Sequence, residues 1–492
     1  MERPEYSWWI ESAQSDSSFL LLMRDEQEFK RRVLCKAEQA ARTDLDTLVS
    51  HCMWRAIWEQ DRFGSMSSIL DDIHPLPEPT EGRAMTGPIR HNHKAVADDT
   101  SSFPALGVTA FWLPWAVEHD MARVDRLAEW ARGCGMTYVR WLGSHNWNDA
   151  LGRGGTERRR SGYFELMERT IGELAARGLR SQITAFSRRH MIDNPTADVS
   201  EWGDLVHAHA NEVILFEIAN EFNHSDNGWS RHEMRALGNV FSSRCSTPLA
   251  LSAPAGETWE DMKNELIPLN DGSSADAVSI HFPRYDKTFE GAWKWVRQPW
   301  HARHHLSSNS PRFVCDNEHQ KWSQSNGGRI VEVASAAPIV AFIAGCGMST
   351  HHDDYGVHTD RGEYGQHDHD KRLQRVLGTV MPLLESMSAD VANWDESRVG
   401  QGGGNHPFPS LHDEHWSFNG DLTHGVSRAF CASGSGDRMV MALTGVKDYV
   451  DLHDVQEKSF KAISLKHGEL VYEGRGPIRL SEASGQSFLI LR

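Results

Sequence analysis

Short apolar runs alternate with amphipathic stretches through the middle of the chain, which predicts strands separated by helices. The expected strands are 105–111, 137–142, 179–186, 212–219, 248–252, 275–281, 312–317 and 339–348. The expected helices are 119–134, 162–177, 201–210, 231–243, 258–269, 289–306, 328–336 and 370–384. Eight such units in about 300 residues predict an α/β fold in which a parallel sheet closes into a (β/α)8 TIM barrel.

The alternating pattern defines three regions. Residues 84–388 carry it and are expected to form the barrel. Residues 1–83 are expected to be a helical N-terminal extension with a linker, because apolar residues recur at helical spacing within 26–58 and prolines follow in 74–82. Residues 389–492 are expected to form a C-terminal antiparallel β-sandwich, with strands at 439–443, 461–465, 469–472 and 487–491.

Two further expectations concern the barrel. A hairpin over 87–97 is placed to plug the bottom of the barrel. A doubly wound open sheet is the alternative architecture, but no glycine-rich phosphate loop follows the first expected strand.

Two expected strands end in a carboxylate. The apolar run 212–219 ends in Asn220 and Glu221, and the run 312–317 ends directly before Glu318. The carboxyl ends of barrel strands meet at one face, where catalytic groups lie. A pair of carboxylates at that face is typical of enzymes that cleave glycosidic bonds.

The strand count adds a third residue. Glu221 follows the fourth strand, Glu318 ends the seventh, and Arg140 lies near the end of the second. In this arrangement residues 84–388 resemble the clan A retaining glycoside hydrolases, and in particular the family 5 cellulase-like enzymes. The resemblance implies cleavage of β-glycosidic bonds in an oligo- or polysaccharide by double displacement, with Glu221 as acid/base and Glu318 as nucleophile.

The resemblance also implies four substrate-binding residues and no cofactor or metal. Arg140 contacts the nucleophile and favours its charged form, whereas Glu221 keeps its proton beside the negative Glu318. Asn220 binds the sugar 2-hydroxyl. His281 ends strand six and Tyr285 follows it, although the spacing to Tyr285 is longer than is usual in the family.

Two other carboxylates compete for these roles. Alternation along the strand is expected to turn Asp316 the same way as Glu318 but one layer deeper, and to turn Glu217 away from the side of Glu221. Further polar and aromatic groups follow the first two strands where sugar subsites would form. These are Trp112, Trp115, His145, Asn146 and Trp147.

The residues after strand eight depart from the family, which commonly has a tryptophan platform there. This chain instead has His351, His352, Asp353, Asp354 and Tyr355, followed by His358, His367 and His369. They form either a polar substrate loop or a metal site, since His and Asp bind zinc and manganese. Two alternative functions therefore stay open: a metal-dependent barrel hydrolase using 351–369, and a non-catalytic carbohydrate-binding or virion-associated barrel.

The composition and net charge limit the kinds of molecule that this protein is expected to bind. A net charge of −17 disfavours nucleic acid and anionic membranes, and 18 tryptophans suit a protein that binds sugars. The seven cysteines contain no Cys-x-x-Cys pair, so neither a disulfide framework nor a zinc ribbon is indicated. No signal peptide and no membrane-spanning run is visible, which makes the cytoplasm the default expectation, and the oligomeric state stays open.

Overall fold

The computed structural model divides into two compact units, Met1–Leu76 and Pro77–Arg492. It describes residues 6–11, 18–23, 83–91, 95–147, 150–256, 259–281, 296, 299, 306–307, 309–311, 313–318, 331–386, 400–402, 416–420, 428–433, 439–446, 449–454, 457–481 and 484–492. Most of the tryptophan-rich helix expected over 289–306 lies outside them.

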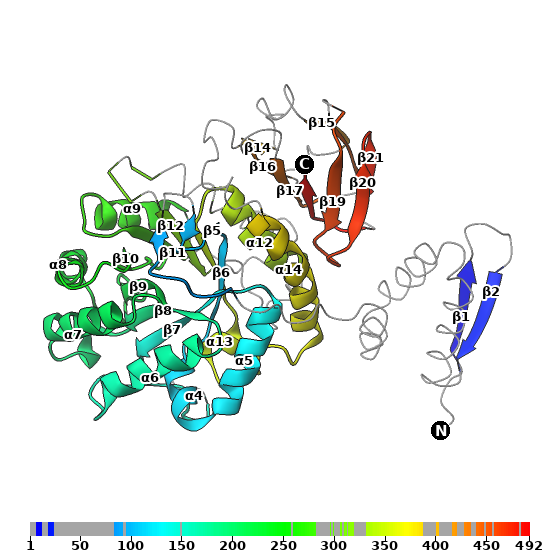
Figure 1. The fold of residues 1–492 in the computed structure, drawn as a ribbon. Helices are drawn as coiled ribbons and strands as arrows, with labels where there is room; N and C mark the ends of the chain where they lie inside the picture. The colour runs from blue at the N-terminus through cyan, green and yellow to red at the C-terminus, as the bar shows by residue number, and fades with distance from the viewer. Residues whose placement is uncertain are drawn as a thin grey trace. The chain divides into compact units, whose positions relative to one another are not determined.

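Eight parallel strands close into a barrel, as the sequence predicts (Figure 1). In chain order they are β6 (Ala105–Thr109), β7 (Tyr138–Ser144), β8 (Arg180–Phe186), β9 (Val213–Ala219), β10 (Leu249–Ala250), β11 (Ala277–His281), β12 (Phe313–Glu318) and β13 (Met348–His351). Each strand pairs with the next along the chain, and β13 closes the barrel against β6. All residues of these strands are buried because helices cover the outside and side chains fill the inside.

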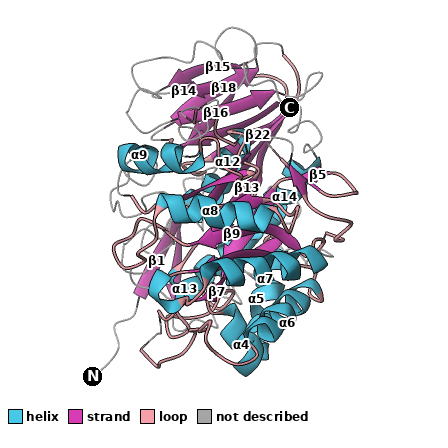
Figure 2. Cartoon of the chain, turned by 90° about the vertical axis from the view of Figure 1, so that its left-hand side faces the viewer, coloured by secondary structure: helices cyan, strands magenta, loops and turns pink. Residues whose placement is uncertain are grey.

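Helices follow the strands and surround them; Figure 2 shows α4 to α8 as a layer outside the barrel. They are α4 (Leu113–His119), α5 (Met121–Gly133), α6 (Tyr163–Ala175), α7 (Pro195–Ala208), α8 (Arg231–Ser242), α9 (Trp259–Asn270), α12 (Val331–Ile343), α13 (Asp354–Val357) and α14 (Asp368–Ser386). Local signals fix their starts. Asn194 caps α7 by accepting from the amide of Ala197, and Ser230 caps α8 by accepting from that of Glu233.

The prediction of a strand over 339–348 is wrong for most of that range. Helix α12 runs to Ile343, and the eighth strand begins only at Met348. Every residue of α12 is buried, so the helix lacks the polar stripe that separates a helix from a buried strand in sequence. The cause is its position between two layers: it packs in one apolar cluster with barrel residues and with Val440 and Leu489 of the C-terminal region.

The C-terminal region is a β-sandwich, as expected. Six strands form one antiparallel sheet: β14 (Gly400–Gly402), β16 (Arg428–Ser433), β17 (Met439–Thr444), β22 (Phe488–Leu491), β19 (Phe460–Ser464) and β20 (Leu470–Gly474). A second sheet contains β15 (Trp416–Gly420), β18 (Tyr449–Asp454) and β21 (Ile478–Ser481). Met441 and Phe488 of the first sheet share a buried cluster with Leu452 and Leu480 of the second. The amide of Gln486 also donates to both carboxylate oxygens of Glu332 in α12, at 3.2 and 3.0 Å.

A small antiparallel sheet closes the amino-terminal end of the barrel, which confirms the expected plug and adds a third strand to it. Its strands are β3 (Arg90–His91), β4 (Val96–Ala97) and β5 (Ser102–Phe103). Apolar side chains of the plug, including Val96 and Phe103, pack on the first residues of the barrel strands, such as Ala277 and Phe313. The loops that follow the strands lie at the opposite, carboxyl-terminal end of the barrel.

The N-terminal unit contains a pair of strands that we did not expect. Its described residues are two strands, β1 (Tyr6–Glu11) and β2 (Ser18–Met23), which pair antiparallel. The helix expected over 26–58 lies outside the described residues. Across the described part of the chain, none of the helices is both long and apolar enough for a membrane span.

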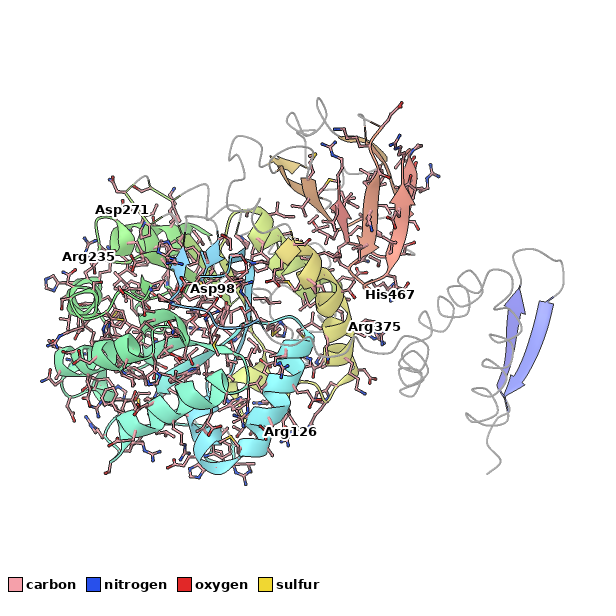
Figure 3. All side chains as sticks on the ribbon, viewed as in Figure 1. Asp98, Arg126, Arg235, Asp271, Arg375 and His467 are labelled. Carbon is pink, nitrogen blue, oxygen red and sulfur yellow. The ribbon has the colours of Figure 1, made fainter. Side chains whose placement is uncertain are left out.

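A buried carboxylate fastens the plug to the barrel. Asp98, labelled in Figure 3, accepts from Nη2 of Arg83 at 2.9 Å and from Nη2 of Arg180 in β8 at 3.2 Å. Burial alone would raise the pKa of Asp98, but hydrogen bonds from Arg83 and from the backbone of Thr100 and Ser101 lower that pKa to about 2.

We predict that Asp98→Asn lowers the free energy of unfolding by about 3 kcal/mol at pH 7, because it leaves the buried guanidinium of Arg180 without its carboxylate. Thermal and urea unfolding measure the change. Because the pKa of Asp98 is lowered in the fold, its contribution is present above the ordinary value of 3.8 and fades as pH falls towards 2.

The neighbouring substitution Asp99→Asn is the control. Asp99 pairs with Arg90 in solvent, both side chains being more than half exposed, so its loss should change stability by less than about 1 kcal/mol. Equal effects of the two substitutions would contradict the role given to Asp98.

Candidate active site

A buried guanidinium lies at the centre of the carboxyl end of the barrel. Arg140 of β7 has no exposed surface. Its Nη1 donates to Oε1 of Glu318 at 2.7 Å, and its Nη2 donates to Oδ1 of Asn220 at 2.8 Å and to Oε2 of Glu217 at 3.3 Å. Burial would lower the pKa of Arg140, but the charges of Glu217 and Glu318 outweigh it and raise this pKa. One side chain therefore links strands β7, β9 and β12.

The turn after β9 holds Glu221 in an uncommon backbone conformation. Glu221 has φ of 44°, one of two non-glycine residues with positive φ among those described. The side-chain amide of Asn227 donates to the backbone carbonyl oxygens of Asn220 and Glu221, each at 2.9 Å. The backbone amide of Phe222 donates to the Ser252 hydroxyl at 3.0 Å. These bonds offset the strain, which is of a kind that concentrates at functional sites.

A register shift aims Glu318 into the same site. The pairing of β11 with β12 slips between Ile280 and His281, so that His281 lies opposite Glu318. Such a bulge re-aims the side chains at a strand end. It corrects our expectation for Asp316, whose contact is the Ser349 hydroxyl of β13 at 3.4 Å, while Asn317 and Glu318 face His281.

His281 lies between the two candidate catalytic carboxylates. Its Nδ1 is 3.0 Å from Oε1 of Glu221, and its Nε2 is 3.6 Å from Oε1 of Glu318. Nη2 of Arg140, which can only donate, is 3.3 Å from the same Nε2. In the neutral imidazole Nε2 is therefore the acceptor, and Nδ1 carries the proton that it donates to Glu221.

The two carboxylates are close but differ in environment. One oxygen of Glu221 and one of Glu318 lie within 4.8 Å of each other, together with a nitrogen of His281. The Glu221 side chain is 25% exposed, whereas that of Glu318 is 4% exposed and holds the bond to Arg140. This arrangement places one ionised carboxylate beside a carboxyl that can exchange protons with a substrate.

Glu217 belongs to the site, contrary to our expectation that it points away. Its Oε2 accepts from Arg140, from the Thr184 hydroxyl at 2.7 Å and from the side-chain amide of Asn317 at 3.0 Å. Its Oε1 accepts from the backbone amide of Ala253 at 3.1 Å. Residues four apart on a strand share a face, so alternation predicts that Glu217 points inward with Glu221. Glu217 supports the site from the layer below.

The remaining predicted residues lie at different distances from the two glutamates. Arg140, Asn220 and His281 meet at the two glutamates, whereas Tyr285 lies outside the described residues. Trp112 and His145 are buried in the wall, and Trp115, Asn146 and Trp147 are half-buried. Of the residues after strand eight, His352 reaches the site: its Nδ1 is 3.7 Å from Oε1 of Glu318 and 3.1 Å from the Thr109 hydroxyl.

A metal site over 351–369 finds no geometric support. Among the described residues, the side chains that approach closely enough to share an ion are Glu221, His281 and Glu318, and no residue of 351–369 is among them. His367 and His369 instead stack on each other and on Tyr355. At the glutamates, the Arg140 cation already neutralises Glu318, which disfavours a second positive charge there.

Comparison with known proteins places this fold among the glycoside hydrolases of known structure. One solved structure described as a glycoside hydrolase has a TM-score of 0.55 at 13% identity, with 82% of this chain and 96% of that chain covered. A glycoside hydrolase family 5 protein from Bacteroides vulgatus has a TM-score of 0.54 at 14% identity, with 82% and 93% covered. No protein-family model and no curated protein matches the chain. At these identities the similarity shows the fold.

We predict that Glu217→Gln lowers the free energy of unfolding by about 2 kcal/mol, because buried Arg140 would lose one of its two carboxylates. Urea unfolding measures the difference. Glu212→Gln, at a half-buried position before the same strand and 3.8 Å from a histidine, is the control and should stay within about 0.5 kcal/mol of the wild type. If Glu217→Gln left the free energy of unfolding unchanged, Glu318 alone would be shown to support Arg140.

Proposed function

We propose that this protein is a glycoside hydrolase that cleaves β-glycosidic bonds of a glycan with retention of configuration. The observation that carries the proposal is the approach of Glu221 and Glu318 to within 4.8 Å. Retaining enzymes hold their two carboxyl groups about 5–5.5 Å apart, whereas inverting enzymes leave about 6.5–9.5 Å for a water molecule. The fold shared with known glycoside hydrolases supports the same reaction class.

Electrostatics assign the two roles. Two carboxylates this close do not both ionise readily, so one proton is shared out between them. Arg140 donates to Glu318 and not to Glu221, which keeps the charge on Glu318 and leaves the proton to Glu221. His281 donates to Oε1 of Glu221 at 3.0 Å, which holds the Glu221 carboxyl in place next to Glu318.

The reaction follows from these positions in two steps. Glu318 attacks the anomeric carbon while Glu221 protonates the departing glycosidic oxygen, which forms a glycosyl ester on Glu318. A water molecule then gives its proton to Glu221 and attacks the anomeric carbon, and the Glu318 carboxylate leaves. Asn220, held by Arg140, is placed to bind the 2-hydroxyl of the sugar.

Replacing the nucleophile tests the proposal. Glu318→Ala should lower turnover of aryl β-glycosides by about 10⁴-fold or more, because no covalent intermediate can form. Circular dichroism should show a retained fold. Glu265→Gln, which removes a carboxylate that pairs with Arg231 between helices α8 and α9, is the control and should keep full activity.

Two outcomes would contradict the proposal. One is near-normal activity of Glu318→Ala. The other is a wild type that binds glycans but hydrolyses none of a panel of aryl β-glycosides and soluble polysaccharides, which would favour a non-catalytic carbohydrate-binding barrel.

Replacing the acid/base gives a different signature. Glu221→Ala should lose about 10²–10⁴-fold on glycosides with poor leaving groups and much less in the first step on dinitrophenyl glycosides, which leave without protonation. Added azide should restore turnover and yield a β-glycosyl azide, because azide attacks without a general base. Equal losses on both kinds of leaving group, without azide rescue, would refute the assignment of Glu221.

A further inference from the structure

The tryptophans at the mouth of the barrel differ in what they can bind. Trp112 is buried, its Nε1 donates to the carbonyl of Tyr355 at 2.6 Å, and the Arg123 guanidinium covers its ring at 4.6 Å. Trp115 packs on the apolar core and on His119. Trp147 is partly exposed and lies in the loop between β7 and α6. Of the described tryptophans that follow the first two barrel strands, Trp147 is therefore the one best placed to present a ring to a sugar.

A continuous series of contacts joins Trp147 to the proposed nucleophile. The Trp147 ring centroid is 5.9 Å from that of Phe111, and the Phe111 ring is 5.8 Å from that of His352. His352 in turn approaches Oε1 of Glu318 to 3.7 Å, and the Arg140 guanidinium lies 5.1 Å from the Phe111 ring. Trp147 thus lies one aromatic ring beyond the groups that surround Glu318.

The loop that carries Trp147 is held in place at several points. The backbone of His145 pairs with that of Thr156, and the His145 imidazole bonds to the Phe111 carbonyl at 3.0 Å. Burial lowers the pKa of His145 to about 4, so the neutral ring donates from Nε2. The Ala150 amide donates to the Asp360 carboxylate at 2.9 Å, which ties this loop to the loop after β13. A ring fixed in this way loses little conformational entropy on binding.

Among the described residues, the position directly after strand eight carries an imidazole, that of His352, rather than an indole. His352 occupies the position beside Glu318, and its Nδ1 lies 3.1 Å from the Thr109 hydroxyl. An imidazole held there can hydrogen-bond a sugar but covers less of a pyranose ring than an indole does. Among the described residues that follow strands two and eight, the larger accessible aromatic face is therefore that of Trp147 in the loop after strand two.

We propose that Trp147 is the sugar-stacking platform of this protein and binds the pyranose next to the one that reacts at Glu318. This inference rests on the proposed function and narrows its substrate. It requires a chain of at least two sugars whose neighbouring ring has an apolar CH face, rather than a single sugar linked to an arbitrary leaving group.

The test compares short and long substrates. The probes are 4-nitrophenyl β-glycosides of glucose, mannose and xylose, each as the monosaccharide and as the β-1,4-linked trisaccharide. For the trisaccharide that the wild type hydrolyses, Trp147→Ala should lower kcat/KM by about tenfold or more, mainly by raising KM. For the matching monosaccharide it should change kcat/KM by less than about twofold. Trp147→Phe should recover part of the loss. Leu151→Ala, an exposed apolar residue of the same loop, is the control and should match the wild type.

Equal losses on both substrate lengths, or no loss on the trisaccharide, would overturn the platform. A wild type inactive on all six probes would count against the proposed function, and calorimetric binding of cellotriose, mannotriose and xylotriose would then decide the platform separately. Binding that Trp147→Ala weakens by about tenfold would support it. Binding that the substitution leaves unchanged, or no binding of any trisaccharide by the wild type, would overturn it.

Discussion

The ion pair between Arg140 and Glu318 is the interaction on which the rest of the candidate site depends. Both groups are buried inside the barrel, where leaving either charge without its partner would cost several kcal/mol. A second carboxylate, Glu217, and the amide oxygen of Asn220 complete the surroundings of the guanidinium. The strand ends β7, β9 and β12 are therefore held in register by one cation, and the geometry of the candidate site follows from that constraint.

Two local departures from regular structure bring the proposed acid/base and nucleophile together. The left-handed backbone at Glu221 turns its side chain back towards His281, and the register shift in β12 turns Glu318 towards Arg140. Neither departure is favourable alone. The hydrogen bonds of Asn227 and the buried ion pair offset them, so the candidate site is held in one geometry. Under the proposed function, such a fixed geometry is the condition for electrostatic catalysis.

The sequence predicts the barrel well because alternation, helix caps and acidic strand ends are local signals. It also predicts that Arg140, Asn220, Glu221, His281 and Glu318 meet, since counting strands brings distant residues to one face. It fails where burial removes the signal, as in α12, which is buried on all sides because it packs against both the barrel and the sandwich.

Three other misses have different causes. A register shift of one residue cannot be inferred from alternation, so the direction of Asp316 was not predictable. The inward direction of Glu217 follows from its even spacing to Glu221, and our expectation misread that signal. The approach of His352 to Glu318 depends on a loop conformation that no sequence pattern encodes.

Mass spectrometry of the protein trapped with a 2-deoxy-2-fluoro β-glycoside tests the central claim most directly. The fluorine slows both steps, and a dinitrophenolate leaving group allows the ester to form and accumulate. The account predicts one added glycosyl group, located on Glu318 in the digested protein. A label on Asp316 or Glu217, or hydrolysis of the matching unfluorinated glycoside without any trapped ester, would contradict it.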